Sequence, residues 1–270
     1  MLSKGLFLGA GLILSAVEAA NTAGCGKAAS ISSGTKQINV NGQQRSYILQ
    51  LPQSYDPNTA HEFYLGLHWL GGSQENVAQG GWYGLQPLAQ QSNTPAIFVA
   101  PQGNDAGWAN PGGSDVRFID AVLDELKSQL CIDDSHVFAL GFSYGASMSR
   151  ALACARPNVF RAVGAMAVGP MSGCDGGSQP IAYFGQHGTA DNVLPFELGE
   201  ETRDQFARNN GCQPQTFPRP ASGSPNWEKT VLRGCKYPVT WIAHSGGHVA
   251  TVDSRGSSTS KELWDFFQQF

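Results

Sequence analysis

Residues 136–145 read HVFALGFSYG, an apolar run that leads into a serine between two glycines. The run predicts a buried strand over residues 136–141, and residues 144–155 predict a helix. A serine hydroxyl becomes a useful nucleophile when a sharp strand-to-helix turn projects it towards a base, and only small flanking residues fit such a turn. The two glycines of this G-x-S-x-G pattern meet that requirement. Ser143 is therefore the candidate nucleophile, with an ordinary turn serine as the alternative in a glycine-rich chain.

Six further short apolar runs, each bounded by turn residues, predict additional strands. They cover residues 45–51, 62–68, 96–100, 162–168, 181–186 and 238–243. Further helical patterns cover residues 114–130, 195–209 and 258–267. Strands that alternate with helices favour a mostly parallel sheet with helices on both faces, in which ligands bind at the carboxyl ends of the strands. Together with the serine turn, this order predicts an α/β-hydrolase fold.

The composition excludes several classes of protein. The chain has 270 residues, of which 41% are hydrophobic and 14% charged, so it can bury a full core and is not intrinsically disordered. Its formal net charge of −4 offers no electrostatic surface for nucleic acid or an anionic membrane. No repeat or low-complexity linker divides the chain. We therefore expect a single catalytic domain, a monomer, with neither nucleic acid nor membrane as a partner.

The first residues predict a secretory signal peptide. A short cationic start at residues 1–4 precedes an apolar run at residues 5–17, and small residues follow at a cleavage position. The run is too short to span a bilayer comfortably, and a hydrophobic first helix or a signal anchor is the alternative. We expect residues 1–19 to be removed and residues 20–270 to form a secreted, extracellular catalytic domain.

All six cysteines lie in the predicted mature part, and an even count in an exported chain indicates disulfides that hold loops in place. No two cysteines show C-x-x-C spacing, so we expect neither zinc nor another metal. The expected strand and helix directions favour one bridge, closure of a proline-rich stretch favours a second, and elimination leaves the third. The predicted pairs are Cys131–Cys154, Cys212–Cys235 and Cys25–Cys174.

The general base must follow the nucleophile in the chain, because α/β-hydrolases place their triad in the order serine, acid, histidine. His248 lies in a loop just after the predicted strand 238–243. His244, at the end of that strand, is the competitor, although a histidine there is equally typical of the core. The two histidines are four residues apart, but two glycines between them argue against a metal-binding helix. We therefore expect His248 to be the base.

The acid must accept a hydrogen bond from the imidazole and stabilise the imidazolium that forms during catalysis. Asp191 lies immediately after the predicted strand 181–186, at the expected catalytic edge. Asp175 is an alternative, but its CDGG context indicates a turn held by a bridge. Asp204 falls within a helical pattern and is typical of a solvated face. Asp191 is therefore the predicted acid.

An oxyanion hole is the third requirement, because negative charge develops on the substrate carbonyl oxygen in the transition state. One donor should be the backbone N–H of Tyr144, next to the nucleophile. The other should come from the loop after an early strand, and residues 67–72, LHWLGG, form the segment of suitable type. Leu70 is the predicted second donor, with Trp69 as the alternative. The double glycine is also compatible with a simple tight turn.

Four segments carry a family resemblance: HWLGG at 68–72, GWANPGGSDV at 107–116, GFSYG at 141–145 and GGH at 246–248. In this order and spacing they resemble the secreted fungal feruloyl esterases of the polyhydroxybutyrate-depolymerase-like branch. The resemblance implies hydrolysis of the ester that joins ferulic or a related hydroxycinnamic acid to plant cell-wall sugars. It also implies the triad Ser143, Asp191 and His248, which the residue order predicts independently. Acetylxylan esterases and polyester depolymerases share the fold and are the alternative activities.

Aromatic residues near the expected catalytic edge are candidates for binding a planar phenol or stacking on sugar rings. Each is also typical of core or lid packing. We place Trp108 first, because its glycine-flanked loop should not need an indole for packing. The predicted substrate contacts are Trp69, Trp82, Trp108 and Phe196.

These residues predict a serine carboxylesterase that works through an acyl-enzyme and needs no cofactor, and the resemblance implies that its substrate is a feruloylated polysaccharide. A peptidase on this fold would need an additional gating domain, and a lipase would need an apolar lid; neither is evident. The rival from another class is a catalytically silent, hydrolase-like carbohydrate-binding protein. The intact candidate triad argues against it.

Overall fold

The computed structural model describes residues 21–221, 224, 227–254 and 256–270. The predicted signal peptide, residues 1–19, lies outside the described residues. Within the described ranges, no helix is both long and apolar enough to cross a membrane.

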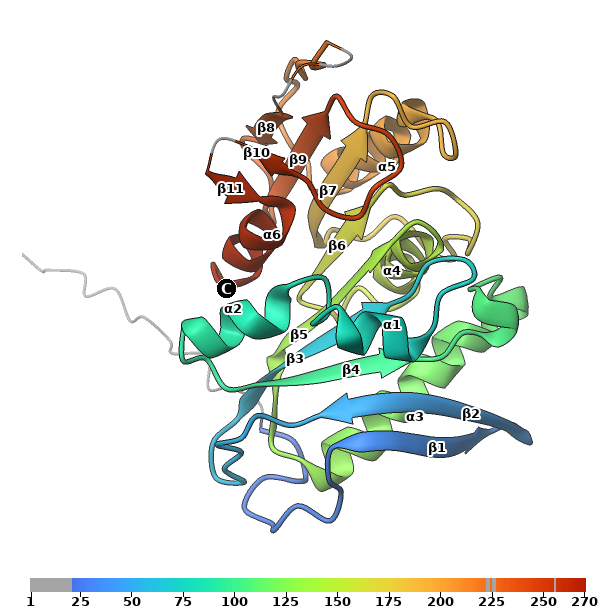
Figure 1. Cartoon of the computed structure of the whole chain (residues 1–270), viewed down its shortest axis with the longest axis vertical. Coiled ribbons are helices and arrows are strands. Elements are labelled where there is room, and N and C mark those ends of the chain that lie inside the picture. Colours follow the sequence, from blue (N-terminus) through green and yellow to red (C-terminus); the bar gives the residue numbers. More distant parts are fainter. Residues whose placement is uncertain (1–20, 222–223, 225–226, 255) are drawn as a thin grey trace, which may run out of the picture.

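Within the described residues, nine strands form one mixed sheet through the middle of the molecule (Figure 1). Their order is β1-β2-β4-β3-β5-β6-β7-β9-β8. The six strands from β4 to β9 in this order are parallel, whereas β1, β2 and β8 pair antiparallel at the edges. The strands are β1 Gly34–Val40, β2 Gln43–Gln50, β3 His61–Leu67, β4 Ala96–Pro101, β5 Ile132–Phe142, β6 Ala162–Met166, β7 Ala182–Gly188, β8 Trp227–Val231 and β9 Val239–His244. A separate two-stranded ribbon pairs β10 Asp253–Ser254 with β11 Ser257–Ser258.

Helices cover both faces of the sheet (Figure 1). Buried residues of α3, α4 and α5 belong to the hydrophobic core on one face, and those of α1, α2 and α6 belong to the core on the other. The helices are α1 Gln74–Gln79, α2 Leu85–Gln91, α3 Ser114–Gln129, α4 Tyr144–Ala155, α5 Phe196–Asn209 and α6 Thr259–Phe267, with short 3-10 turns η1 Asn104–Ala106 and η2 Pro111–Gly113.

The central strands supply side chains to both cores, because successive residues of a strand point to opposite faces. In β5, Val137 and Ala139 pack in the core that contains α3, while Phe138 and Leu140 pack in the core that contains α6. This two-sided burial explains why the strand before the serine turn is a continuous apolar run rather than an alternating one.

The parallel strands finish level with one another along one edge of the sheet. Leu67 pairs with Gly141, Phe142 with Met166, and Gly188 with His244. The segments that follow β3, β5, β7 and β9 therefore emerge side by side. This edge positions the candidate catalytic residues.

All seven predicted strands are present, with ends that differ from the prediction by up to four residues. Strands β1 and β8 were not predicted, because Trp227 is the only buried residue in the two strands and they therefore show no apolar run. Helices α1 and α2 were not predicted either, because they are six and seven residues long, too short to show a helical period.

Three disulfides are present: Cys25–Cys131, Cys154–Cys174 and Cys212–Cys235. The last is the predicted pair. The predicted bridges Cys131–Cys154 and Cys25–Cys174 are wrong, because segments outside the central strands and helices occupy the positions beside Cys131 and Cys154.

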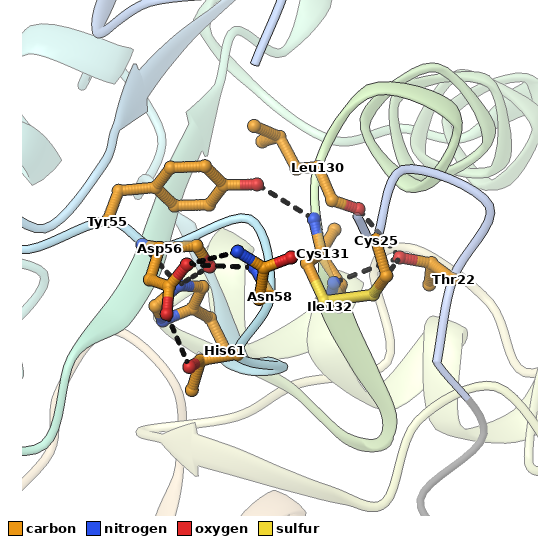
Figure 2. Close-up of a disulfide and its surroundings, with 10 residues drawn as sticks. Thr22, Cys25, Tyr55, Asp56, Asn58, His61, Leu130, Cys131 and Ile132 are labelled. Carbon is orange, nitrogen blue, oxygen red and sulfur yellow. Dashed lines mark hydrogen bonds between the residues drawn. A yellow bond between two sulfur atoms is a disulfide. The ribbon is translucent and has the colours of Figure 1, made fainter. Parts of the chain in front are cut away.

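The first described residues lie against the junction of α3 and β5, where Cys25 forms its disulfide with Cys131 (Figure 2). The Thr22 hydroxyl donates to Leu130 O (2.6 Å) and accepts from the Ile132 amide (2.9 Å). The amide of Gly24 donates to Lys127 O (3.0 Å). These hydrogen bonds fix the N-terminal segment beside Cys131, so that Cys154 is left for another partner.

The connection from β6 to β7 supplies that partner. Arg150 of α4 donates to Gly173 O (3.3 Å), and Gln205 of α5 donates to Gly177 O (3.1 Å). The connection is thus held against both helices, and its Cys174 meets Cys154 at the end of α4.

Candidate active site

Ser143 lies at the turn between β5 and α4 in a strained backbone conformation, with φ 55° and ψ −116°. Its amide donates to Met166 O of the neighbouring strand (2.9 Å), which fixes the turn. A Cβ at Gly145 would lie 2.1 Å from Leu67 O, so only glycine lets the end of β3 approach the first turn of α4. A strained serine at such a turn is the geometry of a nucleophile elbow.

The three side chains of the predicted triad lie within hydrogen-bond distance of one another. His248 Nε2 is 2.9 Å from Ser143 Oγ, and His248 Nδ1 is 2.7 Å from Asp191 Oδ2. The carboxylate accepts from Nδ1–H, which leaves Nε2 as the acceptor for the serine hydroxyl. The three residues follow β5, β7 and β9, so the level ends of these strands bring them together from distant parts of the chain.

The Asp191 carboxylate is completely buried and fully engaged. Its Oδ1 accepts from the amides of Val193 and Leu194, both at 2.9 Å, while Oδ2 faces His248. Burial alone would raise the pKa of Asp191, but the hydrogen bonds from His248 and the two amides outweigh it, and the pKa lies below its ordinary value. Asp191 therefore remains ionised and can stabilise an imidazolium at His248.

His187, the penultimate residue of β7, supports the turn that carries Asp191. Its Nε2 donates to Leu194 O (2.9 Å) and lies 3.3 Å from Asp191 Oδ2. Burial lowers the pKa of His187, so the ring is neutral and donates its single N–H, on Nε2, to Leu194 O. This histidine was not predicted from sequence, although it starts the HGTAD segment that contains Asp191.

The alternative triad members lie elsewhere. His244 is buried, its Nδ1 accepts from the Gly246 amide (3.1 Å), and burial lowers its pKa to about 4. Asp204 pairs with Arg203 on α5, and Asp175 is exposed in the turn after Cys174. None of the three contacts Ser143 or His248 in the hydrogen bonds and ion pairs of the described residues.

The predicted oxyanion donors are two backbone amides, those of Tyr144 and Leu70. The Tyr144 N–H is the first of α4, where a helix leaves its amides without intrahelical partners. The Leu70 N–H lies in the turn after β3, and the next amide, of Gly71, is already bonded to Ala106 O (2.8 Å). Among the described residues, neither the Tyr144 nor the Leu70 amide donates to another backbone group outside the regular elements.

Apolar side chains border this polar centre. Leu70 is 65% exposed, Val193 60% and Val249 39%, and each lies on a different segment of the catalytic edge. The Phe142 ring packs 4.7 Å from the His248 ring, and Trp69 lies beyond it, 6.3 Å from Phe142. Val193, Val249 and Phe142 were missed from sequence, although each is a near neighbour of a predicted triad residue.

Three of the four predicted aromatic contacts are wrong as direct substrate contacts, because their side chains are buried. Trp108 has no exposed surface, Trp82 is 2% exposed and Phe196 is 4% exposed. Trp108 donates from Nε1 to the His68 carbonyl (2.8 Å), so its loop does use the indole for packing. Only Trp69 keeps a partly exposed side chain near the triad. Within the described ranges, no group of three metal-ligating side chains gathers.

Comparison with known proteins identifies close relatives. The chain is 46% identical to the probable feruloyl esterase C of Aspergillus niger, over 98% of this chain and 99% of that protein. It is 48% identical to feruloyl esterase C of Emericella nidulans, over 93% and 92% of the two chains. It is 39% identical to feruloyl esterase D of Neurospora crassa, over 96% and 95%. The model of the prolyl oligopeptidase family matches residues 104–174.

Solved structures share the fold at low sequence identity. A ferulic acid esterase from Anaeromyces mucronatus aligns with a TM-score of 0.62 at 16% identity, over 88% of this chain and 89% of that one. An acetyl xylan esterase from Aspergillus awamori aligns with a TM-score of 0.67 at 16% identity, over 87% and 99%. The architecture is thus that of known esterases.

Proposed function

Because this chain belongs to the fungal feruloyl esterase family, we propose that it hydrolyses feruloyl and related hydroxycinnamoyl esters with Ser143 as nucleophile, His248 as general base and Asp191 as the acid. The observation that carries the assignment of residues is the continuous relay from Asp191 Oδ2 through His248 to Ser143 Oγ, with contacts of 2.7 and 2.9 Å. The relay ends at the first turn of α4, where the Tyr144 amide has no backbone acceptor among the described residues, and acyl transfer requires such a donor for the oxyanion.

In the acylation step, Ser143 Oγ attacks the ester carbonyl carbon while His248 Nε2 takes the hydroxyl proton. The tetrahedral oxyanion accepts hydrogen bonds from the amides of Tyr144 and Leu70. When the intermediate collapses, the bond to the alcohol oxygen breaks, and the sugar alcohol leaves with the proton from His248. The feruloyl group remains on Ser143 as an ester.

In the deacylation step, His248 takes a proton from water as the water oxygen attacks the acyl carbon. A second tetrahedral oxyanion forms on the same two amides. Its collapse breaks the bond to Ser143 Oγ, which recovers its proton from His248, and the free hydroxycinnamic acid departs. Water is the co-substrate that balances this second step.

The exposed apolar side chains of Leu70, Val193 and Val249, which form an apolar rim, suit a planar acyl group. They expose aliphatic surface on the loops that follow β3, β7 and β9, and burial of such surface against an aromatic ring is favourable by roughly 25 cal/mol per Å². Trp69 is partly exposed on the same edge. These side chains support an aromatic acyl group over acetate, which would cover little of the rim.

We also propose that the enzyme acts outside the cell on feruloylated polysaccharide or oligosaccharide. Three disulfides among the described residues fit an oxidising compartment, and the apolar run at residues 5–17 is typical of a signal peptide. N-terminal sequencing of protein collected from the culture medium tests this. A chain that begins at residue 20 is expected, and a chain retained in the cell with residue 1 intact would contradict the proposal.

A panel of esters tests the substrate class. Purified enzyme is offered methyl ferulate, caffeate, p-coumarate and sinapate beside acetylated xylan and an aliphatic polyester. We expect kcat/KM to be highest on hydroxycinnamates and Ser143→Ala to lose several orders of magnitude in kcat. Release of acetate or polyester monomers in preference to any hydroxycinnamate would overturn the substrate class.

Covalent labelling separates an enzyme from a silent binding protein. A fluorophosphonate should label the wild-type chain at Ser143, and Ser143→Ala should remain unlabelled. A wild-type chain that binds xylan but takes up no label would instead support the binding protein.

A further inference from the structure

His68, the first residue after β3, is completely buried between two backbone groups of the catalytic edge. Its Nδ1 lies 2.8 Å from Trp69 O, and its Nε2 lies 2.9 Å from the amide nitrogen of Gly103 and 3.3 Å from the side-chain nitrogen of Gln102. The proposed catalytic cycle gives this imidazole no proton to transfer. Its contacts nevertheless reach the peptide next to the serine turn.

The contacts with Trp69 O and the Gly103 amide determine which ring nitrogen of His68 carries the proton. A backbone N–H can only donate, so Nε2 must be the acceptor for Gly103. Because burial lowers the pKa of His68, the ring is neutral and has a single N–H. That hydrogen must be on Nδ1, and it points at Trp69 O, which can only accept. The Gly103 amide therefore selects the tautomer that donates to Trp69.

The Trp69 carbonyl belongs to the same peptide group as the Leu70 N–H. No cis peptide occurs among the described residues, so the carbonyl and the N–H of this peptide point in opposite directions. A donor that holds Trp69 O on the buried side therefore turns the Leu70 N–H away from it. The Gly72 amide also donates to Trp69 O (3.0 Å), so two donors fix the plane.

We propose that His68 is a positioning residue that orients the Leu70 amide as an oxyanion donor. This inference rests on the proposed function of that amide in ester hydrolysis. His68 acts through the Trp69–Leu70 peptide and does not touch the substrate.

Residues 103–108 hold the other side of the same loop. Trp108 donates from Nε1 to His68 O, and its ring lies 4.9 Å from the His68 ring. The Ala106 carbonyl accepts from the Gly71 amide. The HWLGG and GWAN segments therefore pack together. Trp108 and Gly103 fix the position of His68, and His68 in turn orients the Trp69–Leu70 peptide.

Two substitutions separate the contacts of the two ring nitrogens. In His68→Asn, the amide Nδ2 takes the place of Nδ1 and can still donate to Trp69 O. In His68→Gln, the amide Oε1 takes the place of Nε2 and can still accept from Gly103. The orienting role predicts that His68→Gln lowers kcat on methyl ferulate by about 10²-fold with little change in KM, since loss of one oxyanion donor costs roughly 10²–10³-fold. His68→Asn should stay within about tenfold of the wild type.

A purely structural role predicts the reverse order, because the contact to Gly103 joins two loops and the contact to Trp69 lies within one. Equal losses in the two variants, or a smaller loss in His68→Gln, would overturn the proposal. Thermal unfolding of both variants shows whether a loss of kcat follows a loss of fold. Inhibition by a phenylboronic acid, which forms a tetrahedral adduct on the serine, should weaken in parallel with kcat in His68→Gln.

The wild-type enzyme provides a test that needs no variant. Nitrogen-15 NMR of the histidine side chains should show His68 protonated on Nδ1 and bare on Nε2 at neutral pH, and a proton on Nε2 would overturn the inference. Ser143→Ala keeps this test separate from the proposed function. If that variant retains full activity, the proposed function fails, whereas activity lost in Ser143→Ala but unchanged in His68→Gln contradicts only the positioning role.

Discussion

The negative charge of Asp191 is stabilised both by backbone amides of its own turn and by His248. Two amides bind one carboxylate oxygen, and His248 binds the other, close to the neutral ring of His187. A carboxylate arranged in this way cannot rotate without losing several bonds. It therefore fixes both the rotamer and the tautomer of His248.

Replacement of Asp191 by asparagine tests this function. The amide nitrogen of Asp191→Asn would face His248 Nδ1 as a donor, so the imidazole would turn its bare nitrogen towards it and present an N–H to Ser143. We expect kcat to fall by about 10⁴-fold, as in triads with the wrong tautomer. Steady-state kinetics on methyl ferulate measure this, and circular dichroism should show an unchanged fold. A loss below tenfold would mean that another acid serves His248.

His244 predicts how stability depends on pH. Its pKa is about 4 in the folded protein, against an ordinary value of about 6.5 in an unfolded chain. Between these values the unfolded state binds more protons, so the free energy of unfolding should decrease as the pH falls from about 6.5 to about 4. His244 contributes up to roughly 1.4 kcal/mol per pH unit to this slope.

The variant His244→Asn keeps an acceptor for the Gly246 amide but does not titrate. Urea unfolding of both proteins between pH 7 and pH 4.5 should give a shallower slope for the variant. Curves with equal slopes would show that titration of His244 does not contribute, and a constant offset between them would then reflect packing alone.

Trp108 shows why residue roles near the site were only partly predictable. The order serine, acid, histidine and the position after a strand were sufficient to select Ser143, Asp191 and His248, which the structure brings into contact. Burial of a single side chain depends on what packs against its loop, and the local sequence does not show that. The glycine neighbours suggested an open loop, whereas the Trp108 side chain is buried and donates from Nε1 to His68 O.

At the scale of the element, the junction of β3 with α4 determines whether the site can form. The carbonyls of Leu67 and His68 lie against the first turn of α4, where Gly145 has no side chain. The same approach brings the oxyanion loop beside the nucleophile. Strands with two buried faces, such as β5, were predictable because their apolar runs are continuous, whereas exposed edge strands such as β1 were not.

The variant Gly145→Ala should therefore be strongly destabilised. Its Cβ would lie 2.1 Å from Leu67 O and 2.8 Å from His68 O, and both neighbours are backbone atoms that cannot rotate away. We expect a loss of about 3 kcal/mol or more in the free energy of unfolding. Chemical denaturation measures this loss.

Gly247→Ala is the matched control for stability, because its Cβ would meet only Ala190 O at 3.5 Å, an ordinary contact. We expect it to change the free energy of unfolding by less than about 1 kcal/mol. Similar stabilities for Gly145→Ala and Gly247→Ala would show that the junction can open to admit a methyl group.

At the scale of the whole molecule, the disulfides join parts of the chain that no local pattern relates. Cys25–Cys131 spans 106 residues and connects the N-terminal segment to the start of β5, whereas Cys154–Cys174 spans 20. The predicted pairing considered only strands and helices with clear patterns. The irregular segments around Thr22 and Gly173 decided the outcome through hydrogen bonds that have no sequence signature.

Loop length predicts unequal contributions of these bridges to stability. In the chain-entropy model, the longer loop contributes about 4–5 kcal/mol and the shorter about 3 kcal/mol. The double variant Cys25→Ala/Cys131→Ala should therefore unfold at lower denaturant than Cys154→Ala/Cys174→Ala. Equilibrium unfolding of both, without reductant, gives the order. The opposite order would place the main effect in the native state rather than in the unfolded chain.

The three bridges also join the first cysteine of the chain to the second, the third to the fourth and the fifth to the sixth. A growing polypeptide emerges with its N-terminus first, so each unpaired thiol meets its correct partner as the next cysteine to appear. No later cysteine has to displace an earlier one. The chain can thus be oxidised in step with its synthesis, without the reshuffling by disulfide isomerases that interleaved bridges require.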